Sequence, residues 1–209
     1  MFKTVSLVTL LDGEATEQRI RNSLNAVVEK TESEDVLAIY FCGHGQSVDD
    51  QWYFIPHDLL RPERDEEVLN QGISSRDLAR YLKKAKAQKV LLIMDSCKSG
   101  AALLAFRGYG DRRALMQLAR ASGVYIIAVS TQDQYAAAVK ALGHGVFTHT
   151  LLQGLYGNAA MGGQTMVTVK RLLAYVEEQL PLLSQQFKQR PQYPVVYSIG
   201  MDFPITVVE

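Results

Sequence analysis

Three apolar runs of strand length, each followed at once by small polar residues, constrain this sequence more than any other feature. They span Val36–Phe41, Val90–Met94 and Val124–Val129. A continuous apolar run of this length, rich in branched side chains, is typical of a parallel strand that is buried on both faces. Helix-like segments separate the runs. The sequence therefore predicts an α/β fold, a three-layer α/β/α sandwich around a mostly parallel sheet.

The flanking segments fit the same architecture. We expect a first strand at Val5–Leu11 and a last strand or extended segment at Val195–Ile199. Thr16 is the cap candidate of a helix that runs to about Lys30, and the mixed charges of residues 58–67 predict a surface loop. Further helices are predicted over residues 75–88, 115–121, 147–155 and 169–180.

Length and composition favour one domain and exclude several classes of partner. The 209 residues are 47% hydrophobic, which suits a single domain over residues 1–209. Lys and Arg together number 22, as do Asp and Glu, so no net charge attracts nucleic acid or an anionic membrane. No apolar stretch approaches the roughly 20 residues that span a bilayer. Two cysteines cannot build a disulfide framework, and we expect a cytoplasmic protein.

Residues with reactive side chains follow two of the apolar runs. Cys97 comes shortly after Val90–Met94, and His44 comes after Val36–Phe41 with a glycine on each side. Parallel strands end at the same edge of a sheet, so the two side chains can face each other there. An imidazole near a thiol takes its proton and favours the thiolate. Two simpler interpretations remain: a buried small cysteine, and a tight turn with a solvated histidine.

These segments resemble those of a known family. Val36–Gly45 resembles the strand and His-Gly turn of caspase-like cysteine peptidases, and Met94–Gly100 resembles their nucleophile turn. The likeness is nearer to metacaspases and bacterial caspase-domain proteins than to animal caspases. Trp52–Asp58 and Gly143–Thr148 add further agreement, and the resemblance covers roughly residues 8–207.

The resemblance implies a role for each residue of the two motifs. Cys97 would be the nucleophile and His44 the general acid and base, with a separation of 97 − 44 = 53 that agrees with the spacing of about 50 known for caspases. The backbone N–H groups of Gly45 and Cys97 would form the oxyanion hole. Asp95 would lie in the S1 pocket and select a basic P1 side chain, so the expected cleavage follows Arg or Lys. The alternative for Asp95 is a helix or turn cap.

Other residues carry weaker hypotheses. Asp133 is a second S1 candidate, although a solvated loop acid fits it equally well. Arg112 and Arg113 lie in a charged linker that would suit self-cleavage by an Arg-preferring enzyme. Cys42 is predicted to be a buried spectator thiol. The histidines lack the spacing of a metal site, and the expected chemistry needs no cofactor.

One departure from the family concerns the sheet. Relatives have a first strand and helix before the element that matches Val5–Leu11, and that strand lies between the counterparts of the first two strands predicted here. We expect another chain, or a displaced segment such as residues 1–7, to supply it. Two other functions stay open: a catalytically silent caspase-fold interaction or signalling module, and a nucleotide-binding domain, for which Leu11–Thr16 offers a poor phosphate loop.

Overall fold

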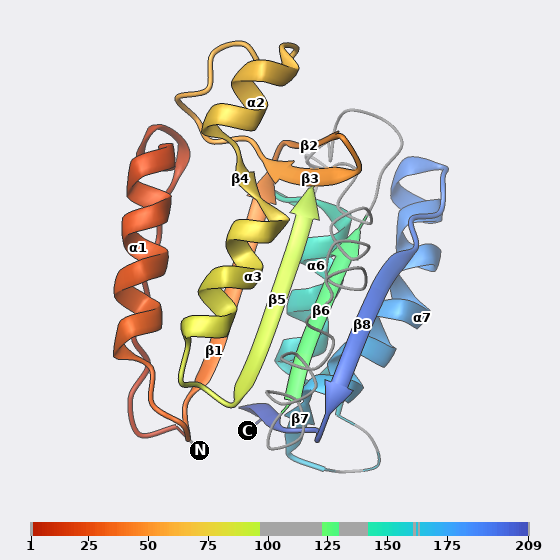
Figure 1. Ribbon diagram of the computed structural model, residues 1–209. Coiled ribbons are helices and arrows are strands. Elements are labelled where there is room, and N and C mark those ends of the chain that lie inside the picture. Colours follow the sequence, from red (N-terminus) through yellow and green to blue (C-terminus); the bar gives the residue numbers. More distant parts are fainter. Residues whose placement is uncertain (1, 97–122, 130–141, 161, 163, 209) are drawn as a thin grey trace.

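A four-stranded mixed sheet forms the centre of the molecule (Figure 1). The computed structural model describes residues 2–96, 123–129, 142–160, 162 and 164–208. In spatial order the strands are β1 (Val36–Gly43), β5 (Lys89–Ser96), β6 (Gly123–Val129) and β8 (Pro194–Gly200). The first three are parallel and β8 is antiparallel to β6. The predicted mostly parallel sheet is confirmed.

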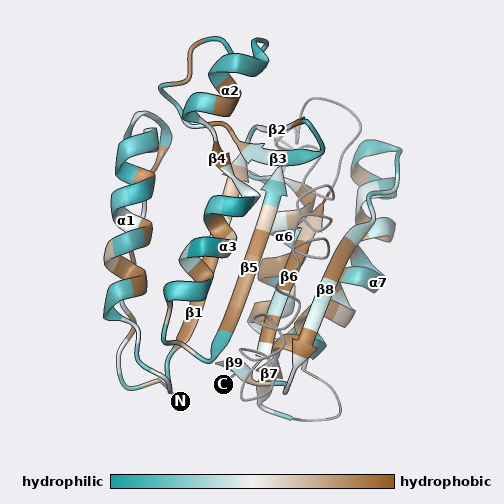
Figure 2. Cartoon of the chain, viewed as in Figure 1, coloured by the Kyte–Doolittle hydropathy of each residue, from teal (hydrophilic) through white to brown (hydrophobic). Residues whose placement is uncertain are grey.

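Helices cover both faces of this sheet. They are α1 (Glu17–Lys30) and α3 (Ser75–Lys84) on one face, and α6 (Val146–Gln153) and α7 (Val169–Lys188) on the other. Because successive strand side chains point to opposite faces, Leu92 belongs to the apolar cluster beneath α1 and α3, whereas Leu91 belongs to the cluster beneath α6 and α7. Figure 2 shows the hydrophobic strands between helices whose outer faces are hydrophilic. This is the predicted three-layer α/β/α sandwich.

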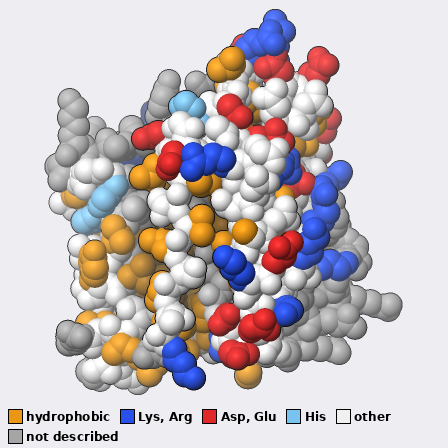
Figure 3. Space-filling model, turned by 90° about the vertical axis from the view of Figure 1, so that its left-hand side faces the viewer, with side chains coloured by type: hydrophobic (Ala, Val, Ile, Leu, Met, Phe, Trp, Pro, Cys, Tyr) orange, Lys and Arg blue, Asp and Glu red, His pale blue; other side chains and the backbone are white. Residues whose placement is uncertain are grey.

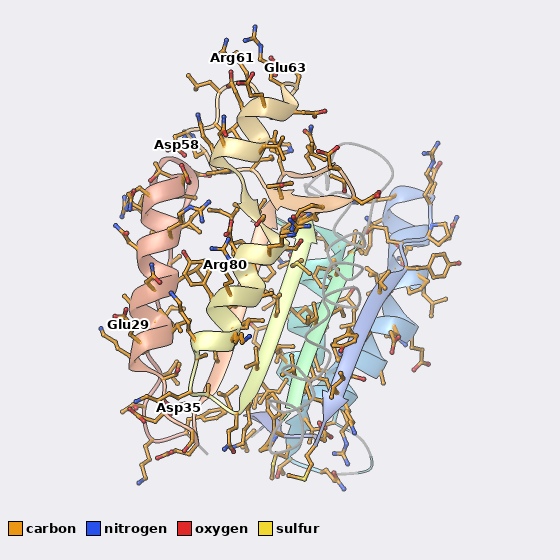
Figure 4. All side chains as sticks on the ribbon, viewed as in Figure 1. Glu29, Asp35, Asp58, Arg61, Glu63 and Arg80 are labelled. Atoms are coloured by element: carbon orange, nitrogen blue, oxygen red, sulfur yellow. The ribbon has the colours of Figure 1, made fainter. Side chains whose placement is uncertain are left out.

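Hydrogen bonds from side chains define the starts of α1 and α3. Thr16 accepts a first-turn backbone N–H of α1 at 3.4 Å, and Asp58 accepts another at 2.9 Å (Figure 4). Ser74 and Asp77 form a reciprocal capping box at the start of α3. Arg21 of α1 lies 3.3 Å from the Asp77 carboxylate, so one ion pair joins the two helices. The predicted Thr16 cap is confirmed.

Smaller elements lie at the two ends of the main sheet (Figure 1). The remaining strands are β2 (Gly45–Val48), β3 (Gln51–Phe54), β4 (Ile73–Ser74), β7 (Met166–Thr168) and β9 (Pro204–Val207). The remaining helical elements are η1 (Asp12–Glu14), α2 (Asp65–Gln71) and η2 (Gly154–Asn158). Strands β2, β3 and β4 form an antiparallel sheet beyond the carboxyl ends of β1 and β5. That small sheet therefore adjoins the edge where the candidate site lies.

The predicted first strand at Val5–Leu11 is wrong. The segment has no strand assignment, and the side chains of Val5 and Leu7 are each 82% exposed. Its composition favours extended backbone, but a strand also needs a hydrogen-bonding neighbour. The described residues include no such neighbour for this segment.

Three further boundaries differ from the prediction. Helix α3 ends at Lys84 rather than near residue 88. The charged loop expected over residues 58–67 gives way to α2 at Asp65, where three acidic residues suit the positive end of the helix dipole. Helix α7 continues past Leu180 to Lys188 despite Pro181, because its apolar face continues with Leu183 and Phe187. The helix predicted at residues 115–121 lies outside the described residues. None of the described helices combines the length and apolar character needed to cross a membrane.

The start of β6 has no room for a side chain, which leads to a stability prediction. A Cβ at Gly123 would lie 2.3 Å from the backbone oxygen of Met201 and 2.7 Å from the Tyr125 ring. We expect Gly123→Ala to lower the free energy of unfolding by about 2–3 kcal/mol, measured by urea denaturation. Gly13→Ala is the control, because a Cβ there meets only His57 at 3.8 Å. Equal effects of the two substitutions would contradict the prediction.

Candidate active site

The pairing of β1 with β5 defines the position of the candidate site. In the parallel register Cys42 lies opposite Asp95, and Gly43 lies opposite Ser96. His44 is the residue after Gly43, and Cys97 is the residue after Ser96, although Cys97 itself lies outside the described residues. Adjacent strands run about 4.8 Å apart, so β1 and β5 end side by side at Gly43 and Ser96. The prediction that both strand ends share one edge is confirmed.

The backbone around His44 turns sharply from β1 into β2. Gly43 has a φ of 154°, which L side chains rarely adopt, and a Cβ there would lie 3.2 Å from the Phe54 ring. The carbonyl oxygen of His44 accepts the N–H of Ile55 at 3.0 Å, which holds the turn against the end of β3. The His44 side chain is exposed. The glycine before His44 is therefore needed for the turn that presents the imidazole.

Asp95 lies at the end of β5 and is buried, with 4% of its surface exposed. The Thr148 hydroxyl of α6 donates to Asp95 Oδ2 at 2.8 Å, and the Tyr40 hydroxyl of β1 lies 2.7 Å from Thr148 Oγ1. A threonine hydroxyl has one proton, so when Thr148 donates to Asp95, Tyr40 must donate to Thr148. A hydrogen-bonded chain thus joins β1, α6 and β5 at the candidate site.

The surroundings of Asp95 change the acidity of several groups. Burial raises the pKa of Asp95, while the Thr148 hydrogen bond and the positive charge of Lys188 oppose that rise. Burial also raises the pKa of Tyr40. The pKa of Cys42 is raised because protein covers part of the thiol and because Asp95 is negatively charged. The net rise in pKa disfavours the ionised form of each of the three groups.

Cys42 itself is exposed, so the prediction that it is a buried thiol is wrong. It follows the buried Phe41 on β1 and points to the opposite face of the sheet. Helix α6 lies behind β5 and β6 in Figure 1, and among the described helices none lies behind β1 on that face. A continuous apolar run indicates burial on both faces only where both faces are covered.

Thr148 and Tyr40 were not predicted as site residues. Thr148 belongs to the Gly143–Thr148 segment, and Tyr40 lies two residues before Cys42 and therefore on the same strand face. The sequence therefore places both residues near the predicted site. It does not indicate that either of them contacts Asp95. The contact depends on where α6 packs against the sheet.

Several predicted residues have no structural test. Asp133, Arg112 and Arg113 lie outside the described residues, as does Cys97. Within the described part of the chain, no three His, Cys, Asp or Glu side chains are grouped in a way that could hold a metal ion.

The layered fold and the adjacent ends of β1 and β5 define a caspase-like α/β/α domain. The chain belongs to the caspase domain family, whose sequence pattern matches residues 3–198. This family is one of cysteine peptidases, so membership points to cysteine peptidase chemistry as the general activity.

A solved structure supports the fold independently. It is the crystal structure of a Geobacter sulfurreducens protein, obtained as a structural genomics target, with a TM-score of 0.57 and 16% sequence identity. The similarity covers 97% of this chain and 83% of the other. At this identity the likeness concerns the fold alone. No match was found among curated protein sequences.

Proposed function

We propose that the protein is a cysteine endopeptidase that uses a Cys97–His44 dyad and cleaves after Arg or Lys. The observation that carries the proposal is the register of β1 and β5, in which Gly43 and Ser96 are paired neighbours. The residue after each is one member of the proposed dyad. Side chains that begin on adjacent strand ends are within reach of each other, which a thiol and its base require.

The proposed reaction proceeds through a thioester. His44 takes the thiol proton, and the Cys97 thiolate attacks the carbonyl carbon of the scissile peptide bond. The backbone N–H groups of Gly45 and Cys97 donate to the oxyanion of the tetrahedral intermediate. When the C–N bond breaks, His44 protonates the leaving amine. Water, deprotonated by His44, then hydrolyses the thioester to a carboxylate and restores the thiol.

The preference for a basic P1 residue rests on Asp95. Its carboxylate lies one residue before Ser96 and is withdrawn from water. In such surroundings an ionised carboxylate attracts a guanidinium or ammonium group strongly and repels an acidic side chain. The hydrogen bond from Thr148 supports the ionised form against the cost of burial. Asp133 is a second S1 candidate in this proposal.

Fluorogenic peptides that differ only at P1 test the proposal. We expect the full-length protein to cleave peptides ending in Arg or Lys and to leave the Asp peptide intact. A clear preference for Asp would contradict the assignment of Asp95. If no peptide is cleaved and a peptide acyloxymethyl ketone labels no cysteine, the catalytically silent interaction module is the better interpretation.

Thr148 provides a finer test through pH dependence. We expect Thr148→Val to raise the pKa of Asp95 further, because the valine cannot donate to the carboxylate. Asp95 must be ionised to bind a basic P1 side chain, so the acid limb of kcat/KM for an Arg peptide should move to higher pH. A pH series from about 5 to 9 on both enzymes measures this shift.

The control for this experiment is Thr150→Val on the same helix. Thr150 is buried, and its hydroxyl donates to the Val146 carbonyl rather than to Asp95. The control should leave the acid limb in place. An unchanged acid limb in Thr148→Val would show that the hydroxyl does not act on the charge that binds P1.

A further inference from the structure

The side chain of Tyr40 lies beside the carboxylate of Asp95. Cys42 pairs with Asp95 across β1 and β5, and Tyr40 is two residues before Cys42, so Tyr40 projects from the same face of the sheet. The Tyr40 hydroxyl lies 2.7 Å from Thr148 Oγ1, which donates to Asp95 Oδ2 at 2.8 Å. One threonine hydroxyl thus joins the phenol to the carboxylate. A side chain that binds Asp95 from this face therefore has the Tyr40 ring as a neighbour.

The carboxylate alone does not explain a choice between the two basic side chains. An ionised carboxylate attracts an ammonium group and a guanidinium group alike. A guanidinium gains an advantage when it donates two parallel hydrogen bonds to both oxygens, but Asp95 Oδ2 already accepts from Thr148. A clear preference for Arg or for Lys therefore needs a second group beside the carboxylate.

Tyr40 has the properties of such a group. It keeps 45% of its surface exposed, so a ligand can reach it, and burial raises its pKa, so the phenol stays neutral. In Figure 3 acidic and basic side chains gather on the half of α1 and α3, across the sheet from Asp95, and the other half is mainly hydrophobic. A planar guanidinium, which is more weakly hydrated than an ammonium group, stacks well on an aromatic face.

We propose that Tyr40 is a specificity-determining residue, whose ring stacks against the guanidinium of a P1 arginine bound to Asp95 and makes the site prefer Arg to Lys. The inference rests on the proposed function, in which Asp95 binds a basic P1 side chain, and it narrows the substrate class to arginine. The ion pair with Asp95 attracts both basic side chains, and the contact with the ring discriminates between them. The bond from Tyr40 to Thr148 fixes one end of the ring.

The first test compares kcat/KM for two fluorogenic peptides that differ only in Arg or Lys at P1. We expect the full-length protein to favour Arg about five- to tenfold, which is the scale of a cation–π contact. Tyr40→Leu removes the ring, so the ratio should fall below about twofold through a loss on the Arg peptide. Tyr40→Phe keeps the ring and should keep most of the preference.

The matched control is Tyr156→Leu, the same substitution at another exposed tyrosine. Tyr156 is 74% exposed in η2, beyond the end of α6 that is opposite to Thr148. The control should leave the ratio unchanged. A protein that cleaves both peptides equally well, a ratio that Tyr40→Leu does not change, or a preference that is lost in Tyr40→Phe would each overturn the proposal.

A binding measurement separates this inference from the peptidase proposal. The sequence contains two cysteines, so in Cys97→Ala the remaining thiol is Cys42, which is exposed on the same strand face as Tyr40. A ligand held between Tyr40 and Asp95 should shield this thiol. We expect Nα-acetylarginine amide to slow its alkylation by iodoacetamide at a lower concentration than Nα-acetyllysine amide does. Tyr40→Leu should make the two concentrations equal.

The two measurements fail in distinguishable ways. Protection by neither amide, equal protection by both, or a difference that survives Tyr40→Leu would overturn the role of Tyr40. Selective protection by the arginine amide in a protein that cleaves no peptide would overturn the peptidase proposal and leave the role of Tyr40 supported.

Discussion

Cys97→Ala should reduce the cleavage of Arg-ended peptides by at least about 10³-fold and abolish labelling by a peptide acyloxymethyl ketone. The proposed reaction breaks the peptide bond only through attack by this thiolate, and removal of a catalytic nucleophile leaves only the residual effect of binding and of the oxyanion hole. Initial rates with a fluorogenic Arg peptide measure the first effect. Intact-protein mass spectrometry after incubation with the ketone measures the second.

The chain offers a matched control for this experiment in its other cysteine. Cys42 is exposed on β1, and its raised pKa makes it a weak nucleophile near neutral pH. Cys42→Ala should therefore still be labelled once per chain. His44→Ala should lose turnover to a similar extent as Cys97→Ala. Label that is retained in Cys97→Ala and lost in Cys42→Ala would exclude the proposed nucleophile.

The same pair of proteins tests self-cleavage. If the enzyme cuts its own linker at Arg112 or Arg113, prolonged incubation of the active chain should produce two fragments while Cys97→Ala stays intact. Mass spectrometry identifies the new termini. An active chain that remains whole would contradict self-cleavage without bearing on the dyad.

Asp95→Asn should lower the activity of the protein and raise its stability. We expect kcat/KM for an Arg peptide to fall by about 100-fold, because a buried charge pair is replaced by a neutral contact. At neutral pH the free energy of unfolding should rise. Burial raises the pKa of Asp95, so the ionised carboxylate is held in the native protein at a cost that asparagine does not have.

The direction of the pH dependence follows from the raised pKa. The native protein binds the Asp95 proton more tightly than the unfolded chain does. The resulting stability is fully present below the ordinary pKa of a carboxyl group, and it is lost as the pH rises through the raised pKa. Asp95→Asn should remove this dependence. Urea denaturation of both proteins between about pH 4 and pH 8 measures it.

Asp77 provides a control, because its pKa is shifted in the direction opposite to that of Asp95. Burial acts to raise its pKa, but hydrogen bonds from Ser74 and the nearby charges of Arg21 and Arg80 outweigh burial, so the pKa is lowered. Its stabilising effect is present above the ordinary carboxyl pKa and is lost as the pH falls through the lowered value. Asp77→Asn should therefore destabilise the protein at neutral pH. If Asp95→Asn behaved in the same way, Asp95 would be a structural cap.

The central sheet could be predicted from the sequence because each of its parallel strands is a continuous apolar run of neighbouring residues. Continuous apolar runs correspond to β1, β5 and β6. The prediction that the strands before His44 and Cys97 end at one edge of the sheet follows in the same way, since parallel strands share their direction. The capping box of Ser74 and Asp77 is local as well, with partners three residues apart.

The incorrect and missed predictions depend on contacts between distant segments. Val5–Leu11 has strand composition, but a strand is defined by its neighbour, which composition does not specify. The bond between Thr148 and Asp95 joins residues 53 positions apart and depends on the packing of α6. Cys42 is exposed because α6 does not extend over β1 in the described structure.

The parallel pairing of β1 with β5 has a consequence for folding. Each paired position lies far along the chain from its partner, as 89 − 36 = 53 for the first pair. Contacts of such long sequence separation form slowly, because the intervening chain must first be closed into a loop. The proposed thiol and imidazole therefore meet only after the sheet has assembled. In the proposed peptidase, a nascent chain would therefore lack the dyad until β1 and β5 have paired.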